Sequence, residues 1–403
     1  MVPWASGNCT PRESLAGAVG PYGTLGFTYD GVGNRITHSS AAGVDLYAYP
    51  PGSNRLSSIT LAAEGNRAFT YDAAGNVPFD DRTGGSYGYT YNAAGRMSEF
   101  RINGFLQASY QYDALGRQAI RTLTSPTPVT IHSVFDSDGR RIAEYDEASG
   151  DLLREYIWNG WDPVALIEGG TIYYVRTDHI GRPIFATNAS GAKVWTASYS
   201  PFGSVQTSTG NLPTPRFPGQ WFQTESGLHQ NWMRDYDPTT GRYLEPDPLG
   251  LVDGANVYGY VKQNPGRWID PRGEEGGPVI PTEVPDNIPG GPYSPKPDGR
   301  PGSFLGPKQP KGPRIECQYV PEGGNKPKPY WKVTQPDGTD QRYDLDGNPI
   351  SADEAHPGNP EVEEPCDCEI YFPRWLVPRL PLLFFDPGIL DSPFPSPFPR
   401  QRA

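Results

Sequence analysis

Two aspartates carry the clearest potential for chemistry in this chain, because each begins an Asp-Pro-x-Gly sequence. They are Asp247 and Asp270. Two carboxylates brought close together cannot both ionise, so one of them holds a proton near neutral pH. Such a pair supplies an acid and a base for activating water or an amide. The alternative interpretation is that both units are turns, in which Asp accepts backbone hydrogen bonds, Pro sets φ and Gly takes a positive φ.

Other chemistry-bearing residue types occur singly and carry weaker signals. His356 is the one histidine in the sequence after residue 275, and it could serve as the general base of a nuclease. A surface histidine before a proline is the favoured interpretation. Cys366 and Cys368 are separated by one residue, but two ligands do not make a zinc site. We therefore predict no metal and no cofactor, and the four cysteines are too few for a disulfide framework.

The elements that must position these residues come from a tyrosine-aspartate repeat. Each copy reads aromatic-x-aromatic, then Asp or Asn, then Gly three residues later. The second aromatic residues of the copies are Tyr29, Tyr71, Tyr91 and Tyr112. The last three tyrosines lie 20 and 21 residues apart, and a fixed period of this length predicts stacked supersecondary units.

Side-chain alternation explains what each copy forms. Successive side chains of a strand point to opposite faces, so aromatic-x-aromatic places two large side chains on the same face. The Asp then opens a turn, and the Gly supplies the positive φ that the turn needs. Each copy therefore predicts a β-hairpin, and hairpins must stack to bury their aromatic faces. Core packing, rather than ligand binding, is the expected role of the repeat tyrosines.

Composition agrees with a repeat protein and excludes several classes. The 403 residues include 48 Gly and 46 Pro, and 12% are aromatic, which favours a mainly β fold. The net charge of −12 argues against a general binder of nucleic acid or of anionic membranes. No basic stretch precedes an apolar run at the N-terminus, so no signal peptide is predicted. No apolar window is long enough to predict a membrane span.

The repeat and the motifs after it resemble the YD-repeat proteins of the Rhs and teneurin-like family. The resemblance covers about residues 20–274, and the segment after the repeats looks like the Rhs repeat-associated core. The matching core motifs are Asp178-His179-Ile180-Gly181-Arg182-Pro183, Tyr199-Ser200-Pro201-Phe202-Gly203, Phe217-Pro218-Gly219-Gln220, Arg234-Asp235-Tyr236-Asp237-Pro238, Gly241-Arg242-Tyr243-Leu244, Asn256-Val257-Tyr258-Gly259-Tyr260 and the two Asp-Pro-x-Gly units.

This resemblance implies an architecture and a set of partners. In that family the repeats spiral into a hollow β-shell, the core segment plugs one end, and a variable C-terminal region follows the last Asp-Pro-x-Gly, often as a toxin held inside. The region after residue 275 would then be cargo, with an immunity protein and secretion machinery as further partners. The protein would be secreted or displayed through a dedicated system after a cytoplasmic stage. The array is shorter than is usual in the family, so we expect a fragment, an orphan gene or the tail of a longer protein.

The resemblance also implies a role for the paired aspartates. In the Rhs core, aspartates at the positions of Asp247 and Asp270 are associated with self-cleavage just past the second unit. Arg242 matches an arginine of the family motif near that site, where it would orient a carboxylate or stabilise an oxyanion. This chain departs from the family at Glu274, where an apolar residue is usual, and a further carboxylate there would repel the pair. His179, in the core, is expected to be a turn residue.

The chain divides by composition into five segments. We expect an irregular N-terminus over residues 1–20, the repeat array over 21–165, the core over 166–274, a Pro/Gly-rich linker over 275–313 and the variable region over 314–403. Within the last segment, Pro-Asp-Gly at residues 336–338 predicts the turn of a further hairpin. No recognisable catalytic motif follows residue 275.

The expected fold is mainly β, with stacked YD-repeat hairpins forming part of a β-shell, closed by an Rhs core plug and followed by a Pro/Gly-rich extension. The leading functional hypothesis is a non-enzymatic scaffold, the shell-and-plug part of a bacterial polymorphic toxin. A second hypothesis is an autoproteolytic core that uses Asp247 and Asp270 to release the C-terminal region. A third is a surface module whose aromatic faces grip glycans or a partner protein, and a fourth is a remnant without function.

Overall fold

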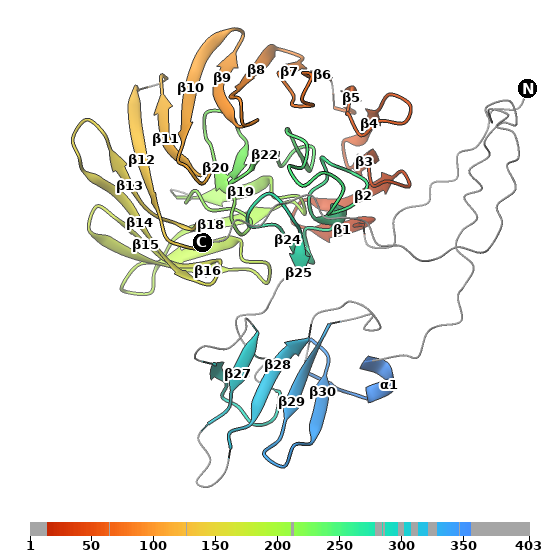
Figure 1. Ribbon diagram of the computed structural model, residues 1–403, viewed down its shortest axis with the longest axis vertical. Coiled ribbons are helices and arrows are strands. Elements are labelled where there is room, and N and C mark those ends of the chain that lie inside the picture. The colour runs from red at the N-terminus through yellow and green to blue at the C-terminus, as the bar shows by residue number, and fades with distance from the viewer. Residues whose placement is uncertain are drawn as a thin grey trace, which may run out of the picture. The chain divides into compact units, whose positions relative to one another are not determined.

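The computed structural model describes residues 14–355, apart from 64, 126, 211–212, 279–283, 285–286, 297–301, 308–312, 321–328 and 346. Within this part of the chain nearly every regular element is a strand (Figure 1). The helical elements there are one 3-10 turn, η1 (Val261–Gln263), and one short helix, α1 (Ala352–Ala355). The prediction of a mainly β fold is confirmed. His356, Cys366 and Cys368 lie outside the described residues.

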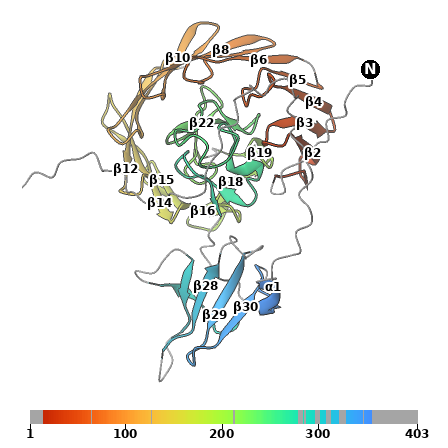
Figure 2. The same cartoon turned by 45° about the vertical axis from the view of Figure 1, so that its right-hand side comes forward.

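Nineteen strands form one antiparallel meander, in which each strand pairs with the next along the chain. The strands are β1 (Gly17–Gly20), β2 (Gly23–Tyr29), β3 (Arg35–Ser40), β4 (Gly43–Ala48), β5 (Ser58–Thr60), β6 (Asn66–Thr70), β7 (Phe79–Arg82), β8 (Gly85–Tyr91), β9 (Met97–Ile102), β10 (Phe105–Tyr112), β11 (Gln118–Leu123), β12 (Val129–Phe135), β13 (Arg141–Asp146), β14 (Leu152–Asn159), β15 (Asp162–Glu168), β16 (Thr171–Thr177), β17 (Pro183–Thr187), β18 (Lys193–Tyr199) and β19 (Val205–Thr209). Figure 2 shows this sheet curving around the segment that follows it.

The repeat turn has the hydrogen bonds expected from its sequence. Between β10 and β11, the Asp113 carboxylate accepts the backbone N–H groups of Leu115 and Arg117 at 2.9 Å each. Gly116 has φ of 75°, a left-handed conformation that glycine adopts without a steric penalty. The Arg117 side chain donates to Asp113 at 2.7 Å and to the Asp136 carbonyl of a later turn at 3.1 Å. The repeat arginine therefore holds its own turn and links it to the next one.

The repeat tyrosines pack into the core, as predicted. Tyr29 is fully buried. In two later copies the first aromatic residue is Tyr89 or Tyr110, and these side chains are 5% and 4% exposed. The second tyrosine of each copy also donates its hydroxyl to a backbone carbonyl of an earlier strand or turn. The pairs are Tyr29 with Leu15, Tyr71 with Leu56, Tyr91 with Val77, Tyr112 with Met97 and Tyr199 with Pro183. Each tyrosine thus packs in the apolar core and also gives a backbone carbonyl of a neighbouring repeat its hydrogen-bond donor.

The sheet extends further along the chain than the expected array of residues 21–165. It begins at Gly17, inside the segment expected to be irregular, and ends at Thr209 in β19. The reason is local, because the same turn recurs after β16. There the Asp178 carboxylate accepts the N–H of Arg182 at 3.0 Å, and Gly181 has φ of 83°. Residues 166–209, expected to belong to the core segment, therefore continue the array.

The plug segment, residues 213–278, follows the meander and consists of short strands and turns. Its elements are β20 (Trp221–Phe222), β21 (His229–Asn231), β22 (Arg234–Asp237), β23 (Arg242–Tyr243), η1, β24 (Trp268–Ile269) and β25 (Gly277–Pro278). Strands β20 to β23 form their own antiparallel sheet. The apolar centre of the segment is aromatic, with Phe217, Tyr236, Tyr243 and Tyr260 buried together.

Buried polar contacts join the plug segment to strands far away in sequence. Arg67 of β6 pairs with Asp237 at 2.8 Å, and Tyr110 of β10 donates to Glu225 at 2.9 Å. Leu228 and Leu244 of the plug segment share a hydrophobic cluster with strand residues of the meander. The curved sheet and the plug segment consequently form one packed unit.

A second, smaller sheet lies in the C-terminal part of the described chain. Its six strands are β26 (Ser294–Pro295), β27 (Ser303–Leu305), β28 (Glu316–Val320), β29 (Tyr330–Thr334), β30 (Asp340–Tyr343) and β31 (Pro349–Ile350). Strands β29 and β30 pair with Thr334 opposite Asp340, which confirms the hairpin predicted at Pro336-Asp337-Gly338. The expected linker over 275–313 contributes β26 and β27, because Phe304 and Ile288 are buried with Trp331 in the core of this sheet.

Candidate active site

The structure brings Asp247 and Asp270 together on one guanidinium group. The Nη1 atom of Arg234 lies 3.0 Å from Asp247 Oδ2, and its Nη2 atom lies 3.2 Å from Asp270 Oδ2. The three side chains are at most 4% exposed. Arginine suits this position because its planar fork can serve two carboxylates at once. The two Asp-Pro units, far apart in sequence, therefore form a single buried charge cluster.

Local structure explains how each carboxylate is positioned. Asp247 lies in a turn, where its Oδ1 atom accepts the Leu249 N–H at 2.7 Å, as in an Asx turn. Asp270 directly follows β24, and its Oδ2 atom accepts the Tyr243 hydroxyl at 2.7 Å. Asn231 donates to the Asp270 backbone carbonyl at 2.9 Å. Both aspartates thus have the turn role considered from the sequence, and both also face the same arginine.

Burial dominates the electrostatics of this cluster. It raises the pKa of Asp247, the Arg234 charge opposes that rise, and the nearby Asp270 adds to it. Burial and the Asp270 charge also raise the pKa of Tyr243 well above its ordinary value. Tyr243 therefore stays a neutral hydroxyl that donates a hydrogen bond to Asp270. The geometry offers one cation, two carboxyl groups and one neutral donor, next to a loop that is partly exposed at Glu274 and Glu275.

The backbone after Asp270 is held in place against this cluster. Arg234 Nε donates to the Gly273 carbonyl at 2.7 Å, and Glu274 N–H donates to Asp270 Oδ1 at 3.1 Å. The peptide group between Gly273 and Glu274 therefore contacts Arg234 on its carbonyl side and Asp270 on its amide side. Gly273 has φ of 67°, and a Cβ atom there would lie 2.3 Å from the Asn231 carbonyl oxygen. Only glycine fits this approach.

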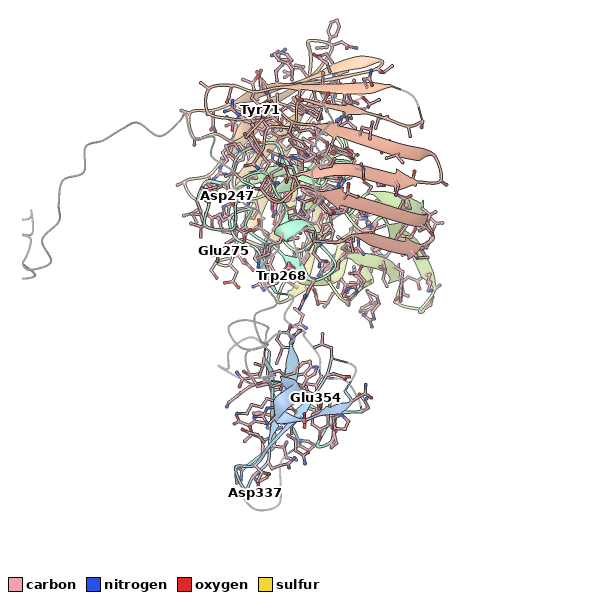
Figure 3. All side chains as sticks on the ribbon, turned by 90° about the vertical axis from the view of Figure 1, so that its right-hand side faces the viewer. Tyr71, Asp247, Trp268, Glu275, Asp337 and Glu354 are labelled. Carbon is pink, nitrogen blue, oxygen red and sulfur yellow. The ribbon has the colours of Figure 1, made fainter. Side chains whose placement is uncertain are left out.

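Residues beyond the turn return to the strand before it. In β25, Gly277 and Pro278 pair antiparallel with Ile269 and Trp268 of β24. The segment from Asp270 to Gly276 is thus the loop of a short hairpin. Figure 3 shows Asp247, Trp268 and Glu275 in the same region of the chain.

Arg242, expected beside the two carboxylates, lies elsewhere. Its guanidinium donates to Asn34 Oδ1 at 3.2 Å, to the Tyr49 hydroxyl at 3.3 Å and to the Asn54 carbonyl. It also lies over the rings of Tyr49 and Tyr258. Arg242 therefore ties the plug segment to the early turns of the meander. The arginine at the paired aspartates is Arg234. It lies in β22, whose arginine reaches Asp270, whereas Arg242 lies in β23 and reaches the meander.

Sequence reasoning missed three further carboxyl groups of this region. Asp253 accepts the Gly276 N–H at 3.1 Å, and burial raises its pKa to about 6. Asp235 and Glu245 form a second buried pair, in which burial raises the pKa of Asp235 to about 7 and that of Glu245 well above its usual range. Asp235 directly follows Arg234 in the Arg-Asp-Tyr-Asp-Pro motif. For Asp235, the available signal was a charged residue inside a strand motif with buried aromatic neighbours.

His179 occupies a turn, in agreement with the expectation for it, and its Nε2 atom lies 3.1 Å from the Gly266 carbonyl oxygen. Among the described residues, no group of three or more His, Cys, Asp or Glu side chains is arranged to hold a metal ion. In the same part of the chain, no helix is both long and apolar enough to cross a bilayer.

Comparison with known proteins shows the family of this chain. The model of the teneurin YD-shell family matches residues 20–265, more than half of the chain. The double-stranded DNA deaminase toxin A of Burkholderia cenocepacia is 28% identical over 318 residues, covering 62% of this chain and 22% of that protein. The probable deoxyribonuclease RhsA of Dickeya dadantii is 28% identical over 247 residues, covering 53% of this chain and 17% of that protein.

A shorter match and one solved structure add to the comparison. The toxin protein Tse5 of Pseudomonas aeruginosa is 38% identical over 104 residues, which is 25% of this chain and 8% of that protein. A chain of the crystal structure of TcdB2-TccC3 has a TM-score of 0.39 and 18% identity, covering 62% of this chain and 17% of that chain. The chain thus spans about a fifth or less of the length of these relatives. On the match over residues 20–265, this chain belongs to the teneurin YD-shell family.

Proposed function

We propose that this chain is the shell-and-plug scaffold of a bacterial Rhs-type polymorphic toxin used in competition between cells. The observation that carries the proposal is the plug segment, which packs against the curved sheet through buried ion pairs such as Arg67 with Asp237. A sheet organised around a separate closing segment suits a container better than an enzyme cleft. The relatives whose names describe toxins or nucleases support the same conclusion.

The partners and location follow from this proposal. The region after residue 275 is the cargo that the scaffold encloses or presents. An immunity protein protects the producing cell, and secretion machinery exports the protein from the cytoplasm or displays it at the surface. Neither the contacts nor the relatives favour the alternatives of a glycan-binding module or a remnant without function.

Expression in a bacterial host tests the cargo assignment. Residues 275–403 and the full chain are induced separately, and growth is followed together with the amount of soluble protein. We expect residues 275–403 to arrest growth and the full chain to arrest it less, because the scaffold holds the cargo. Normal growth with the soluble 275–403 fragment present would contradict a cargo that acts on a cytoplasmic target.

We propose self-cleavage near Glu274 as a second function, on one specific observation. The peptide group between Gly273 and Glu274 lies between Arg234, which contacts its carbonyl oxygen, and Asp270, which contacts its amide. In this proposal one carboxylate removes a proton from water, and the water oxygen bonds to the carbonyl carbon. The C–N bond then breaks, and the leaving amine takes up a proton. Arg234 stabilises the charge that develops on the carbonyl oxygen.

Intact mass of the freshly purified full chain tests this second function. The wild type is compared with Asp247→Asn and Asp270→Asn, and with Asp337→Asn as a control. Asp337 is a carboxylate at an exposed turn of the smaller sheet that likewise accepts a backbone N–H, from Thr339 at 2.9 Å (Figure 3). We expect a break at Glu274 in the wild type and the control, and none in the two site variants. The fragment masses identify the bond that is cut, and a single 44.2 kDa species in the wild type would exclude self-cleavage.

A further inference from the structure

Asp253 lies between the two Asp-Pro units in sequence and contacts the chain beyond the second one. It is half-buried, and its Oδ2 atom accepts the Gly276 N–H at 3.1 Å. A Cβ atom at Gly276 would lie 3.3 Å from this oxygen and 3.4 Å from Val261 Cγ1, so the loop approaches Asp253 closely. This contact falls two residues after Glu274 and one residue before β25. Besides Asp270, Asp253 is therefore a second carboxylate that contacts the hairpin loop.

Four hydrogen bonds hold the backbone of this loop between Arg272 and Gly276. Met233 N–H donates to the Arg272 carbonyl at 3.1 Å, and Arg234 Nε donates to the Gly273 carbonyl at 2.7 Å. Asp270 and Asp253 then accept the amides of Glu274 and Gly276, each at 3.1 Å. Of these four contacts, only the one from Asp253 lies on the C-terminal side of Glu274.

We propose that Asp253 is a positioning residue that pins the Gly276 amide and so holds residues 273–276 across Arg234 and the paired aspartates. Only the effect of Asp253 on the reaction rests on the proposed self-cleavage. The hydrogen bond from the Gly276 N–H to Asp253 is present before any cut. After a cut at Glu274, the same contact retains the first residues of the C-terminal fragment beside the plug segment. The new α-ammonium group of Glu274 would then lie beside Asp270, whose Oδ1 atom accepts the Glu274 N–H at 3.1 Å before the cut.

The charged groups around Asp253 give the contact a pH dependence. Burial is the main cause that raises the pKa of Asp253 to about 6, with Asp270 and Asp247 adding to the rise. The Gly276 hydrogen bond and Arg234 oppose it. A carboxylate is a stronger acceptor than a carboxylic acid. The pinning is therefore complete above pH 7 and weakens as the pH falls through 6.

Hydrogen exchange of the full chain tests the proposal without requiring any cut. The protection factor of the Gly276 amide, the ratio of its intrinsic to its observed exchange rate, is measured at pH 8 and pH 5. The wild type is compared with Asp253→Asn, which keeps one acceptor oxygen but no charge, with Asp253→Ala, and with Asp337→Asn as the matched control. If the wild type cuts itself, all variants are measured in the uncut Asp247→Asn background.

Removal of one hydrogen bond corresponds to a change of about tenfold. We expect protection of Gly276 to fall by about that factor in Asp253→Ala at pH 8, and by less in Asp253→Asn. The wild type should lose protection between pH 8 and pH 5, whereas Asp253→Asn should not, and Asp337→Asn should match the wild type. Equal protection of Gly276 in wild type and Asp253→Ala would overturn the proposal.

A second readout separates this proposal from the self-cleavage on which its effect rests. Where the wild type cuts itself, we expect Asp253→Ala to cut about tenfold more slowly, with Asp253→Asn in between. An uncut wild type contradicts self-cleavage alone, because the exchange measurement still decides the role of Asp253. Normal Gly276 protection together with slow cutting in Asp253→Ala would show that Asp253 does not act by positioning.

Discussion

At the scale of single residues, the charge state of the plug segment depends on which carboxylates have a cation. Asp247 and Asp270 share Arg234, and Asp237 pairs with Arg67, which together with other contacts lowers the pKa of Asp237 despite its burial. Asp235 and Glu245 instead face each other. The Oε2 atom of Glu245 accepts the Asp235 N–H at 2.8 Å. Burial raises the pKa of both acids, and the Asp235 charge adds to the rise for Glu245, so we expect the pair to share one proton near neutral pH.

This pair predicts a pH-dependent stability that Glu245→Gln would remove. The pKa of both acids is higher in the folded state than in the unfolded chain, so their stabilising proton is fully bound below about pH 4. That stability is lost as the pH rises through about 7, the folded-state pKa of Asp235. Glutamine carries no charge at any pH. The variant should therefore be more stable than the wild type at pH 8, by on the order of 1–3 kcal/mol, and similar to it at pH 4.

Unfolding in urea at pH 4 and pH 8, followed by tryptophan fluorescence, measures this difference. Glu99→Gln is the matched control, because Glu99 pairs with Arg101 at the surface. The Glu99 side chain is 34% exposed and the Arg101 side chain is 38% exposed. Its effect should be within about 1 kcal/mol at both pH values. A destabilised Glu245→Gln at pH 8 would contradict the shared proton.

At the scale of elements, the repeat hairpin depends on one tyrosine hydroxyl for each copy. Tyr91, at the end of β8, donates to the Val77 carbonyl at 2.8 Å. Burial raises the pKa of Tyr91 well above its ordinary value, so the hydroxyl stays protonated and donates at any physiological pH. This hydrogen bond joins the copy of the repeat that contains Tyr91 to Val77, which follows the turn of the copy before it. Without it, a buried carbonyl has no partner, and such a group costs about 1–3 kcal/mol.

Tyr91→Phe should therefore destabilise the meander by about 1–2 kcal/mol while leaving the aromatic packing intact. Tyr174→Phe serves as the control, because Tyr174 is 44% exposed. Hydrogen exchange of β7 and β8 is the suitable measurement, since neighbouring repeats open locally as well as globally. Equal exchange in the two variants would mean that the hydroxyl contributes no stability.

At the scale of the whole molecule, the plug segment depends on buried ion pairs that span distant parts of the chain. Arg67 contacts Asp80 of the neighbouring strand, and it contacts Asp237 and Thr239 of the plug segment. The Arg67 side chain is 8% exposed, and the two aspartates are at most 5% exposed. Loss of one partner from a buried group of charges costs about 3–5 kcal/mol, because the remaining charges stay buried.

Arg67→Gln should therefore loosen the plug segment from the sheet. Limited proteolysis between β19 and β20 is the measurement, and we expect the variant to be cut there at a protease concentration that leaves the wild type intact. Arg101→Gln, which removes a partly exposed pair with Glu99, should behave like the wild type, since surface pairs contribute only about 0–1 kcal/mol. A wild-type digestion pattern in Arg67→Gln would show that apolar packing alone holds the plug segment.

Several features of this protein follow from the sequence by itself. The Asp-x-x-Gly turns, the alternating aromatic strands and the hairpin at Pro336-Asp337-Gly338 depend on residues within a few positions of one another. Their backbone angles and side-chain hydrogen bonds are local, so the residue types determine them. The sequence also indicates that the meander continues beyond residue 165, because Asp178 and Gly181 repeat the same turn.

Only the tertiary structure decided which charged groups meet. The family motif predicted Arg242 beside the two aspartates, yet Arg234 lies between Asp247 and Asp270, and Arg242 lies against Asn34 and Tyr49. The contact of Asp253 with Gly276 likewise joins two loops with no local signal. These partners are set by how the turns of the plug segment fold back on one another and on the sheet. Such long-range contacts depend on the burial of many aromatic side chains together, and no short sequence pattern carries that information.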